Sequence, residues 1–239
     1  MDQSLHHLHF AQNRLGYNLP NGARILDFGC GNGISTKALA ELNYDVRGVD
    51  IADHWNTFNS VPPDIRARLL VIPRDPKPLP FPSRYFDFCF SDQVFEHLFD
   101  YEWAFTEIAR VLKPGALSCH RFPGPNRLTE GHIQLPIPLL CYSRLYLSVF
   151  ALAGRRRSDQ EHFSWRQTVD HNEELMRANN YPSKRRLYAI ARGCDVNIEF
   201  RDAEEFSFRR RDVPRVVQAV IRPLLNRYMI IRAAESLAT

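Results

Sequence analysis

The chain has 239 residues, of which 44% are hydrophobic and 24% are charged. This length and composition fit one soluble α/β domain with a full core. The net charge of +4 is too small to indicate nucleic-acid binding by itself, and no nucleic-acid partner is expected.

The cysteines and the N-terminus indicate a cytoplasmic location. Residues 1–10 contain three histidines and no apolar run, so they do not resemble a secretory signal. Widely spaced cysteines without a C-x-x-C pair favour reduced, buried thiols in a reducing compartment. The chain has five of them: Cys30, Cys89, Cys119, Cys141 and Cys194.

Strand and helix patterns alternate in the first half of the chain. Strands are expected over residues 24–28, 45–50, 69–72, 85–90 and 116–122, and helices over about 34–43, 53–60 and 103–112. Five prolines between residues 73 and 82 exclude a helix or a central strand there. The alternation predicts a parallel sheet covered by helices, with ligands at the carboxyl ends of its strands.

The pattern breaks at Pro123 and resumes near residue 183. Residues 139–153 are nearly all apolar, and three arginines follow at 155–157. A helix at 185–192, a strand at 195–200, helical periodicity at 214–226 and a strand at 228–233 then complete the sheet pattern. About 60 residues are therefore inserted at the ligand end of the sheet.

A glycine-rich turn follows the first predicted strand. Asp27 precedes Gly29, Gly31 and Gly33, and a helix pattern begins directly afterwards. Glycine lets the backbone turn sharply and approach a ligand, and the start of a helix presents free N–H groups. A small polar ligand is therefore expected on this turn.

Five blocks in this order resemble the class I S-adenosylmethionine-dependent methyltransferases, in the small-molecule, type 11-like branch. They span about residues 22–122, half of the chain. The blocks are the Asp27–Gly33 loop, Asp50 in 46–50, Arg74-Asp75 with 79–81, residues 86–98 and residues 107–116. The resemblance implies a Rossmann-like seven-stranded, mostly parallel sheet with helices on both faces and a helical lid after the fifth strand.

The resemblance also assigns the S-adenosylmethionine contacts. Asp27 suits the ammonium group, the backbone of the glycine loop the carboxylate, Asp50 the ribose and Asp75 the adenine amino group. The predicted cofactor-binding set is Asp27, Gly29, Cys30, Gly31, Gly33, Asp50, Ile51, Asp75, Ser91, Asp92 and Gln93. Structural alternatives are a helix cap for Asp27, a turn for Asp50 and a solvated loop for Asp75.

Methyl transfer needs alignment of the reactants and, for some acceptors, removal of a proton. His132, His120 and Glu130 follow or end the fifth strand and are candidate bases, and His97 belongs to a family pair with Glu96. The alternatives are lid positioning for His132, packing for His97 and a place within the strand for His120. No spacing of ligand residues predicts a metal site.

The predicted activity is O-methylation of a small-molecule, glycan-like or lipid-linked acceptor, assisted by a histidine base. The rivals are a catalytically silent methyltransferase-like binding module and a nicotinamide-dependent oxidoreductase. The acceptor, the methylated atom and the oligomeric state stay open. A D-P-P-Y or N-P-P-Y sequence is absent after the fourth strand, which argues against methylation of nucleic-acid bases.

One domain is expected, in three parts. Residues 1–122 form the cofactor-binding part, 123–182 the inserted substrate and lid region, and 183–239 complete the core. The apolar run at 139–153 is too short to span a membrane. It is either a lid helix packed over the active site or an interfacial helix at the inner face of a membrane, next to the basic residues 155–157 and 209–211.

Overall fold

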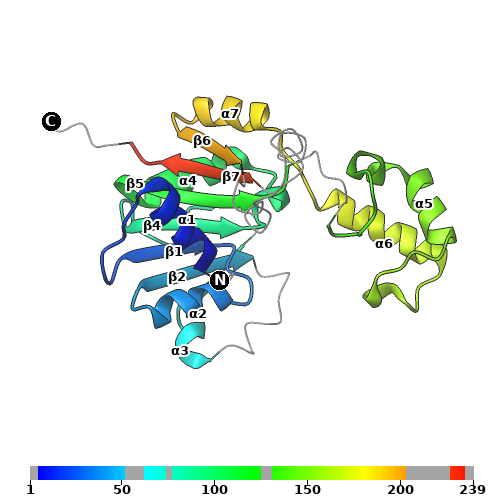
Figure 1. The fold of residues 1–239 in the computed structure, drawn as a ribbon, viewed down its shortest axis with the longest axis horizontal. Coiled ribbons are helices and arrows are strands. Elements are labelled where there is room, and N and C mark those ends of the chain that lie inside the picture. The colour runs from blue at the N-terminus through cyan, green and yellow to red at the C-terminus, as the bar shows by residue number, and fades with distance from the viewer. Residues whose placement is uncertain (1–4, 52–61, 74–76, 125–130, 203–226, 235–239) are drawn as a thin grey trace, which may run out of the picture.

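A seven-stranded sheet forms the centre of the molecule (Figure 1). The computed structural model describes residues 5–51, 62–73, 77–124, 131–202 and 227–234. The strand order is β3-β2-β1-β4-β5-β7-β6, with β7 antiparallel to both of its neighbours. The strands are β1 (Arg24–Phe28), β2 (Asp45–Ile51), β3 (Leu69–Ile72), β4 (Phe86–Asp92), β5 (Leu112–Phe122), β6 (Asn197–Asp202) and β7 (Arg227–Arg232). The predicted fold class is confirmed.

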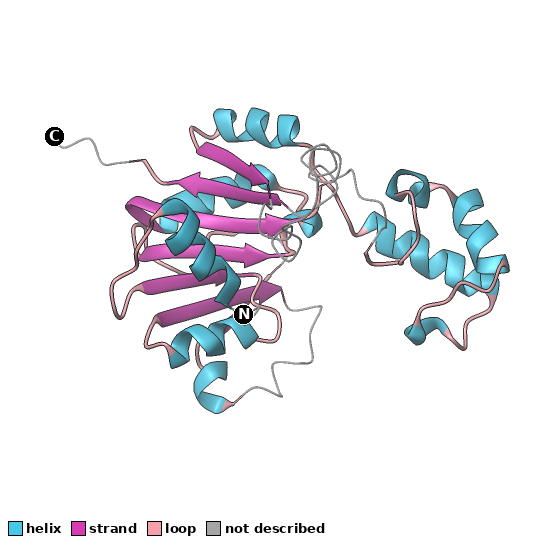
Figure 2. Cartoon of the chain, in the orientation of Figure 1, coloured by secondary structure: helices cyan, strands magenta, loops and turns pink. Residues whose placement is uncertain are grey.

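Helices cover both faces of this sheet (Figure 2). Side chains alternate between the faces, as the two-residue period of a strand requires. In β7, Tyr228 and Ile230 pack with α1 and α2, whereas Met229 and Ile231 pack with α4 and α7. The helices of the described chain are α1 (His6–Leu15), α2 (Ile34–Glu41), α3 (Pro63–Arg66), α4 (Tyr101–Val111), α5 (Arg144–Leu152), α6 (Trp165–Arg177) and α7 (Lys184–Gly193), with 3-10 turns η3 (Phe95–His97), η4 (Pro138–Tyr142) and η5 (Ser158–Gln160).

Three helices depart from the sequence prediction. The short helix α3 was not expected; it begins at Pro63, because proline fits the first helical position. The polar stretch before Asn180 contains α6, whose start has a capping box formed by Ser164 and Gln167. No helix was expected at α1, where three histidines weaken the hydrophobic contrast. The predicted helices at 53–60 and 214–226 lie outside the described residues.

The insert between β5 and α7 forms a helical lid with a small core of its own. Figure 1 places α5 and α6 beyond the carboxyl ends of the parallel strands. Leu147 of α5 is buried against α6, whereas Leu140 is 42% exposed. The buried face of α5 therefore packs on α6 within the lid rather than on the sheet. No helix in the described ranges is long and apolar enough to cross a bilayer.

Candidate active site

The turn between β1 and α2 carries the predicted glycine loop at the ligand end of the sheet. Gly29 has a φ of +81°, and a Cβ there would lie 2.2 Å from Cγ2 of Val94. Gly31 has a φ of +51°, but a Cβ there would meet no atom within 4 Å. Packing within the protein therefore requires glycine at 29, whereas Gly31 borders open space in which a ligand can approach the backbone.

Two amides of this loop point into the protein. The N–H groups of Gly29 and Cys30 both donate to the carbonyl of Val49, at 2.8 and 3.0 Å. The Cys30 thiol is buried with Ile65 and Leu69. These two N–H groups therefore hold the loop against β2.

Asp50 connects the end of β2 to the glycine loop. Its Oδ2 accepts a hydrogen bond from the Gly31 amide at 2.6 Å, and its Oδ1 accepts one from the Ile51 amide at 2.7 Å. The Gly33 amide closes the loop on the Cys30 carbonyl at 2.8 Å. The tertiary structure thus brings the loop and the second predicted acid together at one edge.

Asp27 is a buried carboxyl group beneath this edge. Its Oδ2 accepts a hydrogen bond from the Thr36 hydroxyl at 2.8 Å, a partner that the sequence analysis missed. Burial raises the pKa of Asp27 to about 7; the Thr36 bond opposes this shift, and the charges of Asp50 and Asp92 add to it. A cationic ligand group at this position would stabilise the ionised carboxylate.

Asp92 ends β4 in an ion pair with β5. Arg121 donates two hydrogen bonds to its carboxylate, from Nε at 2.8 Å and from Nη2 at 2.7 Å. His7 of α1 places Nε2 3.9 Å from Oδ2, but burial lowers the pKa of His7, so the arginine carries the pairing. Burial alone would raise the pKa of Asp92, but the His7 and Arg121 contacts outweigh it and lower this pKa. Gln93 follows with a φ of +55°, and its backbone N–H donates a hydrogen bond to the Arg121 carbonyl.

Ser91 and His120 face each other inside the sheet. The Ser91 hydroxyl lies 2.8 Å from His120 Nδ1, and Ser118 Oγ lies 2.8 Å from His120 Nε2. Both side chains are fully buried, and burial lowers the pKa of His120 to about 3. Both ring nitrogens of His120 thus lie against serine hydroxyls inside the sheet, which argues against His120 as the base.

Two other candidate histidines meet although they are distant in sequence. The rings of His97, on η3, and His132, at the start of the lid, are 5.2 Å apart and nearly perpendicular. His132 Nδ1 lies 2.9 Å from the Tyr181 hydroxyl, and His97 Nδ1 lies 3.5 Å from the Ala178 carbonyl. Tyr181 was missed because nothing in its local sequence links it to residue 132. Glu130 lies outside the described residues.

Asn180 fastens the lid to the sheet domain at this point. Its backbone N–H donates to the Glu96 carbonyl at 2.5 Å, and its side-chain Nδ2 donates to the Leu98 carbonyl at 3.3 Å. The Tyr101 hydroxyl donates to the Asn180 carbonyl at 2.9 Å. These bonds hold the end of α6 beside η3 and thereby position the histidine pair.

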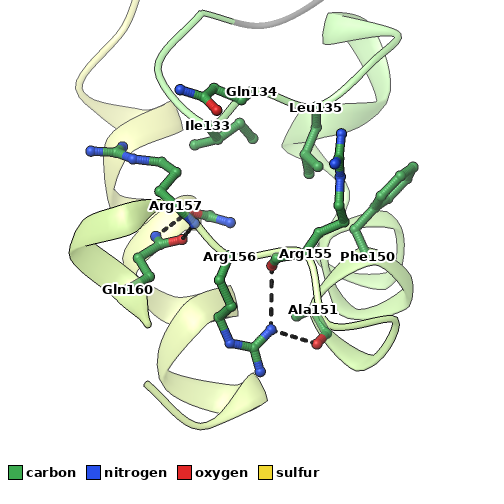
Figure 3. A pocket seen from close by; sticks show the side chains of 10 residues that line it. Ile133, Gln134, Leu135, Phe150, Ala151, Arg155, Arg156, Arg157 and Gln160 are labelled. Carbon is green, nitrogen blue, oxygen red and sulfur yellow. Dashed lines mark hydrogen bonds between the residues drawn. The ribbon is translucent and has the colours of Figure 1, made fainter. Parts of the chain in front are cut away.

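Two cavities lie near these elements. One cavity, of about 180 Å³, is lined by residues 71–73 and 77–80, at the end of β3. The end of β2 is adjacent, because Ile51 pairs with Ile72. Asp75 is outside the described residues. The other, of about 40 Å³, lies inside the lid between Gln134, Phe150 and Arg155 (Figure 3). The lid cavity has room for ordered water but not for an acceptor.

Comparison with known proteins agrees with this geometry. Residues 26–119 match the family described as "Methyltransferase domain". The 2-methyl-6-phytyl-1,4-hydroquinone methyltransferase of Synechocystis sp. is 34% identical over 102 residues, which cover 41% of this chain and 31% of that protein. The demethylmenaquinone methyltransferase of Bacillus licheniformis is 31% identical over 101 residues, covering 41% of this chain and 44% of that protein. The match thus spans less than half of either relative.

A solved structure has the same fold over most of the chain. An S-adenosylmethionine-dependent methyltransferase from Mesorhizobium loti superposes with a TM-score of 0.56 at 17% identity, covering 93% of this chain and 97% of that one. The fold is that of the class I S-adenosylmethionine-dependent methyltransferases. The family match covers residues 26–119, within the half of the chain whose motifs resemble this class of enzyme.

Proposed function

We propose that this chain transfers a methyl group from S-adenosylmethionine to a hydroxyl group of a small-molecule, glycan-like or lipid-linked acceptor, with His132 as the base. One observation carries the proposal: the Gly31 amide meets Asp50 at 2.6 Å, beside the buried carboxyl of Asp27. This arrangement presents a cation site and a hydroxyl-binding carboxylate on one edge of the sheet.

The residues present fit the cofactor. When bound, S-adenosylmethionine supplies a methyl group that is already activated on a sulfonium. Asp27 would pair with its ammonium group, which offsets the cost of a buried carboxylate. Asp50 can accept two hydrogen bonds from ribose hydroxyls. The cavity of about 180 Å³ beside the end of β2 offers an apolar place for the adenine ring.

The histidine pair supports the assignment of the base. Tyr181 orients the Nδ1 edge of His132, and we place the proton transfer from the acceptor hydroxyl at Nε2. His97 packs edge-on against the same ring and would limit its rotation. With the proton held at Nε2, the acceptor oxygen would be free to receive the methyl group that bound S-adenosylmethionine would supply.

The names of the two relatives indicate one kind of acceptor, but the family match does not extend to the lid. Their names refer to a phytyl hydroquinone and to demethylmenaquinone, and a quinol hydroxyl is one acceptor of the proposed class. The family match ends at residue 119, before the lid begins. We therefore assign acceptor recognition to residues 123–182, which the comparison with that family does not reach.

Ligand-dependent unfolding separates the proposal from its rivals. S-adenosylhomocysteine should raise the thermal unfolding midpoint, whereas NAD should leave it unchanged. Protection by NAD alone would instead favour the oxidoreductase. Methyl transfer is then followed by mass spectrometry on a panel of quinols, phenols and lipid-linked sugars. Protection without transfer to any member would favour a silent binding module.

A further inference from the structure

The outer face of α5 is an exposed apolar stripe. Leu145, Val149 and Leu152 are 77%, 57% and 64% exposed. Their spacing of four and three residues puts them on one side of the helix. Leu147 and Ala151 lie on the other side and are buried against α6. Packing within the lid therefore uses one face of α5 and leaves the other face uncovered.

The stripe continues into the turn before α5. Ile137, Leu140 and Tyr142 are 55%, 42% and 53% exposed. Of the thirteen large hydrophobic side chains exposed on the described residues, six fall between residues 137 and 152. Exposed apolar side chains are common singly, but such a concentration on one surface marks an interaction site.

The charged side chains within the segment that carries this stripe are all basic, and Asp159, directly after it, pairs with Arg157. Residues 131–158 contain four arginines and neither aspartate nor glutamate. Arg144 is paired with Asp170 and Glu173 of α6, on the inner side of the lid. Arg155 is exposed, and Arg156 donates to the carbonyls of Ala151 and Phe163 rather than to an acid (Figure 3). The C-terminal end of the stripe is therefore cationic.

These features favour a lipid surface over two other occupants. A second copy of this chain, docked with the same face, would offer Arg155 and Arg156 no acid from its residues 131–158 in either helix orientation. A peptide would be held by a groove, whereas this surface is the convex side of a helix. The nine residues of α5 are also far too short to span a bilayer.

We propose that the outer face of α5, with the turn at residues 137–142, docks in the headgroup region of a membrane that contains anionic lipid. The apolar stripe enters the interface, and Arg155 and Arg156 contact the anionic headgroups. Figure 1 shows the lid beyond the carboxyl ends of the parallel strands, with α5 at the end of the lid away from the sheet.

Vesicle flotation of the full chain tests this proposal without methyl transfer. We expect the protein to float with phosphatidylcholine–phosphatidylglycerol vesicles at low salt, and to stay in solution with phosphatidylcholine alone or at high salt. The double variant Leu145→Gln/Val149→Gln should lose flotation, and Arg155→Gln should weaken binding about fivefold. The fold should tolerate the two substitutions, because Leu145 and Val149 are both exposed.

The control is the double variant Leu42→Gln/Tyr188→Gln, which changes exposed apolar residues on α7 and after α2. It should float like the unchanged protein. Failure of the unchanged protein to float on anionic vesicles would overturn the proposal, as would flotation that survives the α5 double variant. Light scattering that shows a dimer, lost in the α5 variant and unaffected by vesicles, would assign the face to self-association instead.

Discussion

Asp50 is the residue on which cofactor recognition depends most directly. Asp50→Ala should weaken binding of S-adenosylhomocysteine by about 1.5–3 kcal/mol, because charge-assisted hydrogen bonds to the ribose are lost. Calorimetric titration measures this change. Asp45→Ala is the matched control, since Asp45 begins the same strand and pairs only with surface arginines at 3.4 and 3.7 Å. An unchanged affinity in Asp50→Ala would refute the ribose assignment.

Substitution of Gly31, compared with substitution of a second glycine of positive φ, distinguishes the loss of ligand contact from backbone strain. Gly31→Val places a branched side chain in the open space that we assign to the cofactor, and binding should be lost more completely than in Asp50→Ala. Gly22→Val is the control, because Gly22 also has a positive φ, +72°, with no atom near its Cβ position. Both variants should lose stability by about 1–2 kcal/mol through the left-handed conformation. Equal binding by the two variants would contradict the assignment.

Asp27 should make binding and stability depend on pH. Its pKa of about 7 exceeds the ordinary 3.8, so the folded state holds a proton that the unfolded state has released. Stability of the unliganded protein should therefore fall as pH rises from about 4 to about 7. Asp27→Asn should flatten that slope, measured by urea unfolding at several pH values.

The same carboxyl should release a proton on binding the cofactor. An ammonium partner favours the ionised form, so affinity should rise with pH up to about 7 and then level off. Below that pH, the calorimetric enthalpy should vary with the ionisation enthalpy of the buffer. Identical enthalpies in all buffers, or a dependence that persists in Asp27→Asn, would show that Asp27 is not the partner.

At the scale of elements, the contact between η3 and the start of the lid creates the candidate base. His132→Ala should lower turnover by about 10²–10⁴-fold with cofactor affinity intact. Single-turnover methyl transfer measures the effect, with His171→Ala as a control on the lid, where His171 faces Asp159. His97→Ala should cost less, because we expect His97 to position the ring. A loss of turnover of tenfold or less in His132→Ala would show that His132 also has a positioning role and is not the base.

At the scale of the molecule, the lid and the sheet domain have separate cores. The two large clusters around the sheet contain no residue from 131–182, and the lid cluster consists of lid residues. Replacing residues 131–182 by a short Gly/Ser linker should therefore keep stabilisation by S-adenosylhomocysteine and abolish methyl transfer. Thermal unfolding and the transfer assay test this division. Loss of cofactor binding would show that the lid also builds the cofactor site.

The sequence by itself determined the strands around the cofactor site. Residues 24–28, 45–50 and 69–72 are short apolar runs bounded by turn residues. The length of each run and the turn residues at its ends are enough to place these strands. The order of Asp27, the three glycines and Asp50 likewise identified the ligand edge, because strand ends of a parallel sheet converge there. The structure confirms that Asp50 and Gly31 meet.

Only the tertiary structure decided which candidates share a site. The sequence offered His97, His120 and His132 as catalytic candidates without showing which of them meet. In the structure, strand pairing buries His120 between Ser91 and Ser118. The bonds of Asn180 hold the end of the lid beside η3, where His97 and His132 meet. The pairing of Asp92 with Arg121 follows from β-strand register, and the uncovered face of α5 from its packing on α6. These are contacts between residues far apart in the chain, and no local pattern encodes such partners.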